Sequence, residues 1–228
     1  MLRALSGGIA LDCVGAQGLG LSKFTLGAAP GVELVAGVLL AASTARPLDM
    51  VLLDQLYISA PFIWGAIYGF GWQSSTVQHC KLYNYRENNQ PTVLLTSINR
   101  YSLSSTFTTI VSSPLNVSDI DFIKCEVHDF SRQYEGTCFL FDGPTDIAVI
   151  GGNMSQLGNV TPSRAYCQAL ADPQRITFNP VRAYVDLGPA VTQHVFHVQP
   201  GQVAHTIDFH VASSLQYSVS KLSGTILA

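Results

Sequence analysis

Residues 101–151 have the sequence YSLSSTFTTIVSSPLNVSDIDFIKCEVHDFSRQYEGTCFLFDGPTDIAVIG, in which apolar and polar residues alternate in short runs separated by turn residues. This pattern is typical of strands in an antiparallel sheet. Ile120 and Phe122 fall on one face of a strand, whereas Ile123 and Cys125 are shifted by one position. A shift of one residue within a strand indicates a β-bulge. The sequence therefore predicts a β-rich protein with a bulge after Phe122.

The composition favours association with other chains. The chain has 228 residues, of which 12% are charged and 47% are hydrophobic, and its mean hydropathy is +0.26. Soluble globular chains usually contain about 25% charged residues. So little charge leaves apolar surface that a partner subunit or a repeated assembly would cover. We therefore expect one domain over residues 1–228 whose partners are other copies of itself, a capsid shell protein, or both.

Three segments follow one another along the chain. Residues 1–30 are rich in glycine and predict an N-terminal arm. Residues 31–80 form an apolar segment rich in aromatic residues. Residues 91–228 contain many short β-like runs separated by Pro and Gly, and no internal repeat is apparent. This β-rich body predicts an antiparallel sandwich or a jelly-roll-like fold.

Two or three short helices are expected beside these strands. Residues 32–45 are almost uniformly apolar and stop before a proline, and residues 48–58 place their leucines on one helical face. Residues 163–172 begin with a candidate N-cap serine and end before Pro173. The fold class predicted from the sequence is therefore mainly β, with two helices in the N-terminal third and a third helix nearer the C-terminus.

Neither nucleic acid nor a membrane is an expected partner. The net charge is −3 and the twelve Lys and Arg residues are scattered, whereas nucleic-acid binding needs clustered cations. Residues 55–80 lack charged side chains, but Pro61 and several glycines interrupt a run shorter than the roughly 20 residues of a spanning helix. Asn116, Asn153 and Asn159 lie in glycosylation sequons, which would matter only in a secreted chain.

The five cysteines do not predict a zinc site, because no two of them form a CxxC pair. They are Cys13, Cys80, Cys125, Cys138 and Cys167. Cys125 and Cys138 are spaced so that they would face each other across a hairpin. Buried free thiols are the favoured interpretation, because such cysteines usually behave as small hydrophobic residues.

No metal, cofactor or catalytic residue is predicted. Four histidines lie close together in sequence, at His194, His197, His205 and His210. Strand alternation directs neighbouring histidines to opposite faces, so they do not converge on one ion. Asp119 and Asp121 share a strand face, Glu126 and Asp129 lie beyond the bulge, and Asp142 and Asp146 lie around a turn. The solvated face of an amphipathic strand is the favoured interpretation of these carboxylates. No GxSxG motif is present.

The sequence thus favours a non-enzymatic structural subunit that self-assembles or decorates a larger assembly. The particular expectation is a viral capsid or capsid-surface protein, located in the virion and assembled in the host cytoplasm. Aromatic side chains contribute disproportionately to interfaces. The predicted contact residues are Phe62, Trp64, Tyr68, Phe70, Trp72, Phe209 and Tyr217.

Other classes of function remain open from the sequence alone. A metal-dependent or carbohydrate-active β-sandwich enzyme would use the histidines or the paired carboxylates. A carbohydrate-binding module would use exposed aromatic residues such as Tyr83 and Tyr85, which alternation places on one face. A membrane-associated glycoprotein would use the sequons.

Overall fold

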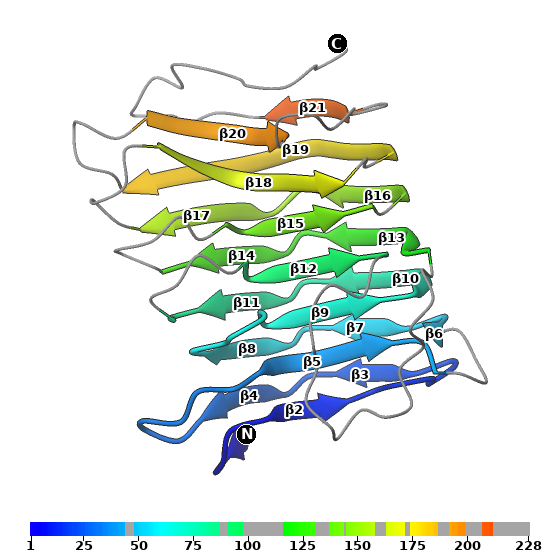
Figure 1. Cartoon of the computed structure of the whole chain (residues 1–228), viewed down its shortest axis with the longest axis vertical. Coiled ribbons are helices and arrows are strands. Elements are labelled where there is room, and N and C mark those ends of the chain that lie inside the picture. The colour runs from blue at the N-terminus through cyan, green and yellow to red at the C-terminus, as the bar shows by residue number, and fades with distance from the viewer. Residues whose placement is uncertain are drawn as a thin grey trace.

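The computed structural model describes most of the first half of the chain and parts of the second. The described residues are 1–43, 48–86, 91–97, 116–130, 137–143, 145–157, 163–171, 174–186, 192–198 and 207–211. Their regular structure consists of strands, and the chain rises from β1 to β21 in an elongated stack (Figure 1). No helix occurs among these residues.

The strands form three sheets. Sheet A contains β1 (Leu2–Ala4), β4 (Thr25–Ala28), β8 (Tyr57–Ala60), β11 (Lys81–Asn84), β14 (Glu126–Asp129), β17 (Asn153–Leu157) and the second part of β19 (Gln174–Asp186). Sheet B contains β2 (Ile9–Asp12), β5 (Ala36–Ala41), β9 (Ile67–Phe70), β12 (Val93–Thr96), β15 (Phe139–Asp142), β18 (Ser163–Ala171) and β20 (Thr192–Val198). Sheet C contains β3 (Gly20–Ser22), β6 (Leu48–Asp49), β7 (Leu52–Asp54), β10 (Trp72–Gln78), β13 (Ser118–Ile123), β16 (Thr145–Ile150), the first part of β19 and β21 (Ile207–Val211).

Every pairing between these strands is parallel, so the fold is a β-solenoid. The chain passes from sheet C to sheet A and then to sheet B, and each strand pairs with strands one turn before and after it. The predicted antiparallel sandwich or jelly roll is therefore wrong. Alternation along a strand shows which side chains face the core. It does not show the direction of the neighbouring strand, because the same face is buried beside a parallel and beside an antiparallel strand.

The three predicted helices are also wrong. Within residues 32–45 the chain forms β5, whose six residues are all buried. A strand covered on both faces is a continuous apolar run and resembles a buried helix in sequence. Within residues 48–58 the left-handed Met50 (φ 53°) and Gln55 (φ 55°) interrupt any helix and separate β6, β7 and β8. Residues 163–171 form β18, which pairs with β15 and β20.

A two-residue corner joins sheet C to sheet A in successive turns. Its first residue has positive φ in each of five turns, at Lys23, Gln55, His79, Lys124 and Gly151. The left-handed conformation turns the chain sharply and restarts the inward and outward alternation. The phase shift after Phe122 arises from this corner, between β13 and β14, and not from a bulge within a strand.

A second left-handed position lies earlier in the sheet C strands. Asp119 has φ 57° and lies opposite Ser74, between the Gln73–Ser118 and Ser75–Ile120 pairs, so the register is kept. The same position is left-handed in neighbouring turns, at Gly18, Met50, Ser74, Asp146 and Arg175. This kink is therefore a stacked feature of sheet C and not a bulge.

The last described corner differs from the others because it contains Pro180. The proline ring fixes φ near −65°, so this residue cannot adopt the left-handed conformation. The chain instead continues as the thirteen-residue strand β19, which pairs with β16 and then with β17. Sheets A and C join through this strand.

The interior between the sheets is apolar and rich in aromatic residues. Phe122, Phe139, Phe141 and Phe178 are fully buried and their rings contact one another, with centroids 5.3–6.4 Å apart. Trp72 packs edge-on against Phe122 at 6.4 Å. These contacts connect sheets B and C and stabilise the stack.

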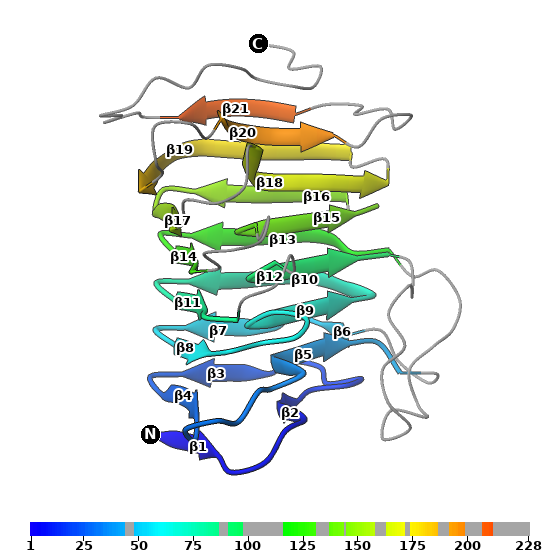
Figure 2. The same ribbon diagram turned by 60° about the vertical axis from the view of Figure 1, so that its left-hand side comes forward.

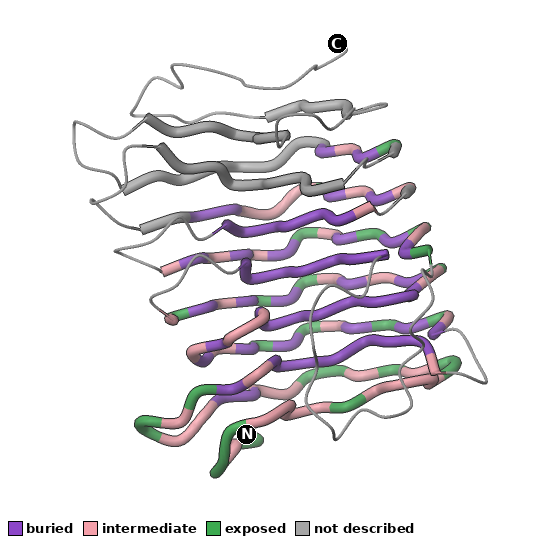
Figure 3. The backbone as a smooth tube through the Cα atoms, viewed as in Figure 1, coloured by how far each residue is buried: buried purple, intermediate pink, exposed green. Residues whose placement is uncertain are grey.

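Sheet B is buried on both faces, unlike the other two sheets. Val38, Ile67 and Val93 belong to the interior, whereas Leu39, Tyr68 and Leu94 belong to a second apolar cluster on the outer face. Figure 3 shows β5, β9, β12 and β15 buried along their whole length, while strands of sheets A and C alternate between buried and exposed.

The turns of the solenoid continue through all three segments expected from the sequence. Residues 2–28, within the predicted arm, form β1 to β4 and pair with the following turn. β10 lies at the end of the predicted second segment, and β11 lies between the second and third segments. The structural repeat does not appear as a sequence repeat, because segments of unequal length separate equivalent positions in successive turns. Leu26, Ile58, Leu82 and Val127, for example, pair in register on successive strands of sheet A but are unevenly spaced in sequence.

Candidate functional site

An aromatic surface covers the middle of the outer face of sheet A. Its members alternate with the buried residues of β8, β11 and β14, so they point away from the core. We call this surface the aromatic face; it comprises Tyr57, Tyr83, Tyr85, His128 and Phe130. Figure 2 shows the strands that carry it stacked one above another.

The rings of the aromatic face form one connected group. Tyr83 lies at the centre, with ring centroids 5.3 Å from Tyr57, 4.6 Å from His128 and 5.7 Å from Phe130. Tyr85 and Phe130 stack almost in parallel, at 4.7 Å and 10°. Edge-to-face and offset-stacked pairs each contribute roughly 0.5–1.5 kcal/mol beyond area burial. The contacts hold the rings in place before any ligand arrives.

Two of the five rings are substantially open to solvent. Tyr85 is 44% exposed and Tyr57 is 36% exposed, while the other three are half-buried. Both exposed rings contact Tyr83 edge-on, and the Tyr57 and Tyr85 side chains also lie next to each other. The aromatic face therefore combines a fixed centre with two accessible rings.

Charged groups border the rings. The Lys81 Nζ lies 3.2 Å from Glu126, and the Tyr83 hydroxyl donates a hydrogen bond to the same carboxylate at 3.0 Å. Burial, with a further contribution from Glu126, raises the pKa of Tyr83 well above its usual range. Burial also lowers the pKa of His128, so this imidazole is neutral at pH 7. The surface thus offers hydroxyl and imidazole groups beside one ion pair.

Buried Asn84 fixes the chain between Tyr83 and Tyr85. Its Oδ1 accepts hydrogen bonds from the backbone N–H groups of Phe62 and Arg86, both at 3.0 Å. Its Nδ2 donates to the carbonyl oxygens of Phe62 and Pro91, both at 3.4 Å. A fully bonded buried amide makes the end of β11 rigid and sets the position of Tyr85.

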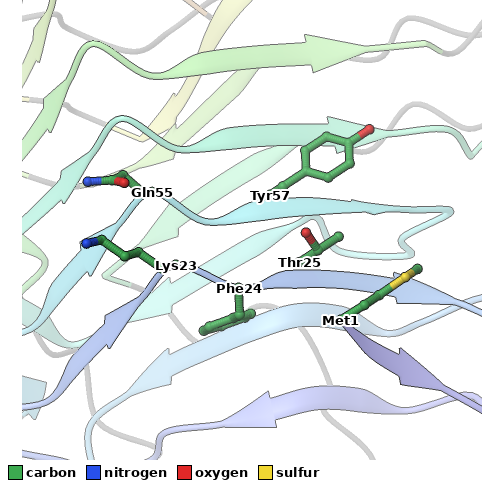
Figure 4. Close-up of a pocket in the computed structure, with 6 residues that line it drawn as sticks. All are labelled: Met1, Lys23, Phe24, Thr25, Gln55 and Tyr57. Carbon is green, nitrogen blue, oxygen red and sulfur yellow. The ribbon is translucent and has the colours of Figure 1, made fainter.

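A shallow groove adjoins the aromatic face at Tyr57. It has a volume of about 510 Å³ and lies over the corners of two successive turns. The lining residues are Met1, Lys23, Phe24, Thr25, Gln55 and Tyr57. In Figure 4, Lys23 and Gln55 extend in the same direction from neighbouring turns, while the Tyr57 ring stands beside Thr25.

The structure places most of the predicted contact residues inside the fold. Phe62, Tyr68, Phe70 and Trp72 have no exposed surface within the chain, whereas Trp64 is half-buried. Phe209 belongs to β21, where only the backbone is described, and Tyr217 lies outside the described residues. Their role in contacts between chains stays a prediction.

The other groups considered from sequence do not converge. Among the described residues, Cys13, Cys80, Cys125 and Cys138 form no disulfide with one another. Cys125 is stacked on Cys80 at equivalent corners, and the Cys138 Sγ donates to the Val127 carbonyl at 3.3 Å. No group of three or more His, Cys, Asp or Glu side chains in the described part of the chain is arranged to hold a metal ion.

The candidate carboxylates are distributed over different surfaces. Asp119 and Asp121 are exposed on sheet C, and burial followed by the nearby Asp119 charge raises the pKa of Asp121. Asp146 pairs with Arg175, whereas Glu126 faces out from sheet A. The buried carboxylates are Asp129 and Asp142. Asp119 and Asp121 remain together as predicted, but in the described ranges they belong to no larger group of His, Cys, Asp or Glu side chains that could hold a metal ion.

The four clustered histidines, for which no metal site was predicted, fall in the last part of the chain. His194 and His197 belong to β20 and His210 belongs to β21, where only the backbone is described. His205 lies outside the described residues. In the part of the chain that is described, no helix is both long and apolar enough to cross a membrane.

Comparisons with models of known protein families, with curated proteins and with solved structures found no significant match to this chain.

Sequence reasoning identified Tyr83 and Tyr85 as a same-face pair but missed Tyr57, His128 and Phe130. The signal exists in the motifs LYISA, LYNYR and VHDF, each of which begins with a buried aliphatic residue followed by an aromatic one. It becomes visible only when β8, β11 and β14 are aligned in parallel register.

Proposed function

We propose that the aromatic face is a glycan-binding surface and that the chain is a non-enzymatic binding module. One observation carries the proposal: five contacting rings lie on one outer sheet face, and two of them, Tyr57 and Tyr85, are open to solvent. Isolated exposed aromatic residues need no explanation, but a connected group of them does.

The chemistry of the surface suits a sugar chain. One face of a pyranose ring presents C–H groups, which pack against the negative face of an aromatic ring, while its hydroxyls need polar partners. The Tyr57 and Tyr85 rings would supply the stacking surfaces. The polar partners are the Lys81 and Glu126 pair and the His128 imidazole. Rigid rings also lose little conformational entropy on binding.

Charge argues against nucleic acid as the stacked ligand. Bases also stack on aromatic residues, but their phosphates require clustered cations. Lys81, the lysine nearest to the central ring, is already paired with Glu126, and the whole chain has a net charge of −3. A ligand with many hydroxyls and little charge fits the aromatic face better.

A glycan array probed with the full chain tests this proposal. Wild type should bind a subset of the oligosaccharides, and Tyr85→Ala should weaken that binding by up to about tenfold, the upper end of the range for loss of one stacking ring. Leu52→Ala is the matched control, because it removes a 42% exposed apolar side chain from sheet C. No binding by wild type, or equal losses in both variants, would contradict the proposal.

A second function is favoured by the outer face of sheet C. Leu52 and Ile150 are 42% and 39% exposed on different strands of this sheet, and Met50, two residues before Leu52, is 61% exposed. Only 12% of the chain is charged. We propose that this face contacts other copies of the chain or a shell protein in a larger assembly such as a virion. The glycan surface on sheet A would then remain free.

Light scattering coupled to size exclusion tests the assembly. A large discrete particle is expected, and replacing Leu52 and Ile150 together by serine should reduce its mass. A wild-type monomer at all concentrations would overturn the assembly proposal and leave glycan binding untouched. The predicted contact Trp64 is tested in the same way with Trp64→Ala.

A further inference from the structure

The groove beside Tyr57 has a rigid backbone frame made from two successive corners. Lys23 (φ 56°) and Gln55 (φ 55°) hold the same left-handed position one turn apart. The Lys23 N–H donates to the Asp54 carbonyl at 3.0 Å, and the Tyr57 N–H donates to the Phe24 carbonyl at 3.0 Å. The register fixes the lining side chains relative to one another.

Lys23 is an uncompensated cation at this groove. It is exposed, and no carboxylate of the described residues lies within ion-pair distance of its Nζ. Asp54 lies in the turn that follows Lys23. Its carboxylate, however, accepts hydrogen bonds from the side-chain amides of Gln55 and Gln78, each at 3.2 Å. It also lies 3.5 Å from His79. The Asp54 charge is thus directed toward the following turn.

Tyr57 belongs to both surfaces, which makes the groove an extension of the aromatic face. Its ring lines the groove and also meets Tyr83 edge-on at 5.3 Å. A sugar chain on the aromatic face that continued past Tyr57 would enter the groove that Lys23 also lines. Thr25 adds a hydroxyl, and Met1 and Phe24 add apolar lining.

We infer that this groove binds the anionic substituent of an acidic sugar, with Lys23 as its counter-charge and Tyr57 as the stacking wall. The inference rests on the proposed glycan binding and adds the class of glycan. A carboxylate of a uronate and a sulfate ester share the required chemistry, because both accept charge-assisted hydrogen bonds from an ammonium group. Neutral sugars would still stack on the aromatic face.

The test compares neutral oligosaccharides with their uronate and sulfated counterparts on one array. Wild type should favour at least one acidic form, and the form that it favours identifies the anion. Lys23→Gln should weaken binding of that form about tenfold, the usual loss for a hydrogen bond to a charged group, and leave neutral binding unchanged. Lys23→Arg should retain the preference.

Lys124→Gln is the matched control. Lys124 holds the equivalent corner position with φ 51° and is equally exposed, but it lies outside the groove. It should behave as wild type, and urea unfolding should show that both glutamine variants are folded. Equal binding of neutral and acidic forms, or an unchanged preference in Lys23→Gln, would overturn the inference while the glycan proposal stands. Absence of all glycan binding would overturn both.

Discussion

The outer faces of sheets A and B carry similar residues in different surroundings. On sheet B, Tyr68, Phe70 and Leu94 have no exposed surface. On sheet A, Tyr57 and Tyr85 are 36% and 44% exposed. Both faces belong to parallel sheets of the same stack, so strand geometry does not cause the difference (Figure 3).

This difference in exposure indicates that an aromatic residue on the outer face of the solenoid has one of two roles. Where it is covered, it contributes to stability through burial, and where it is open, it is available to a ligand. The sequence around each residue differs accordingly. IYGF, in β9, is a continuous apolar run, whereas KLYN, in β11, alternates with polar residues. Continuity of the apolar run therefore distinguishes the two roles.

Truncation of Phe70 should give the largest effect. Phe70→Ala on sheet B should lower the free energy of unfolding by about 3–5 kcal/mol, because it leaves a cavity at a fully buried site. Tyr85→Ala on sheet A should cost only about 1 kcal/mol, mainly its ring contacts. Urea unfolding of both variants measures the contrast. Similar losses would remove the distinction between a packed and an open face.

Some parts of this architecture were predictable from local sequence. The inward positions of Ile120 and Phe122 and of Cys125 are buried as alternation predicts. The same-face placement of Tyr83 and Tyr85 is confirmed by their ring contact. Each of these follows from the side-chain period of a single strand, which needs no knowledge of its neighbours.

Strand direction and partners were not predictable in this way. Leu82 pairs with Ile58 and Val127, two residues far from it in sequence and at unequal distances. No periodic sequence motif marks the turns, so the sequence does not reveal that they stack on one another. The left-handed corners add to this, because Lys23, Gln55 and Lys124 are not residue types that signal positive φ.

The aromatic face should also respond to pH through His128. Burial, assisted by Lys81 and opposed by Glu126, lowers the pKa of His128 below its ordinary value of 6.5. The unfolded chain therefore takes up a proton near pH 6.5 that the folded chain resists. The contribution of the neutral His128 imidazole to the free energy of unfolding is therefore fully present above pH 6.5, and it is lost as the pH falls below that value.

Urea unfolding at pH 7 and at pH 5 measures this effect. Wild type should lose more stability on acidification than His128→Gln, which has no imidazole to protonate. The difference should be smaller than the loss in Phe70→Ala, because His128 remains half-buried and partly solvated. The same acid-dependent loss in both proteins would show that His128 does not contribute.

The smallest effect is expected from the ion pair at the border of the aromatic face. The Lys81 and Glu126 side chains are 52% and 30% exposed, so water screens their attraction. Lys81→Gln should therefore lower the free energy of unfolding by less than about 1 kcal/mol, and added salt should remove even that difference. A loss as large as that of Phe70→Ala would mean that Lys81 is covered as the residues of sheet B are. The two outer faces would then differ in composition and not in exposure, and the case for an open ligand surface on sheet A would fail with the measurement.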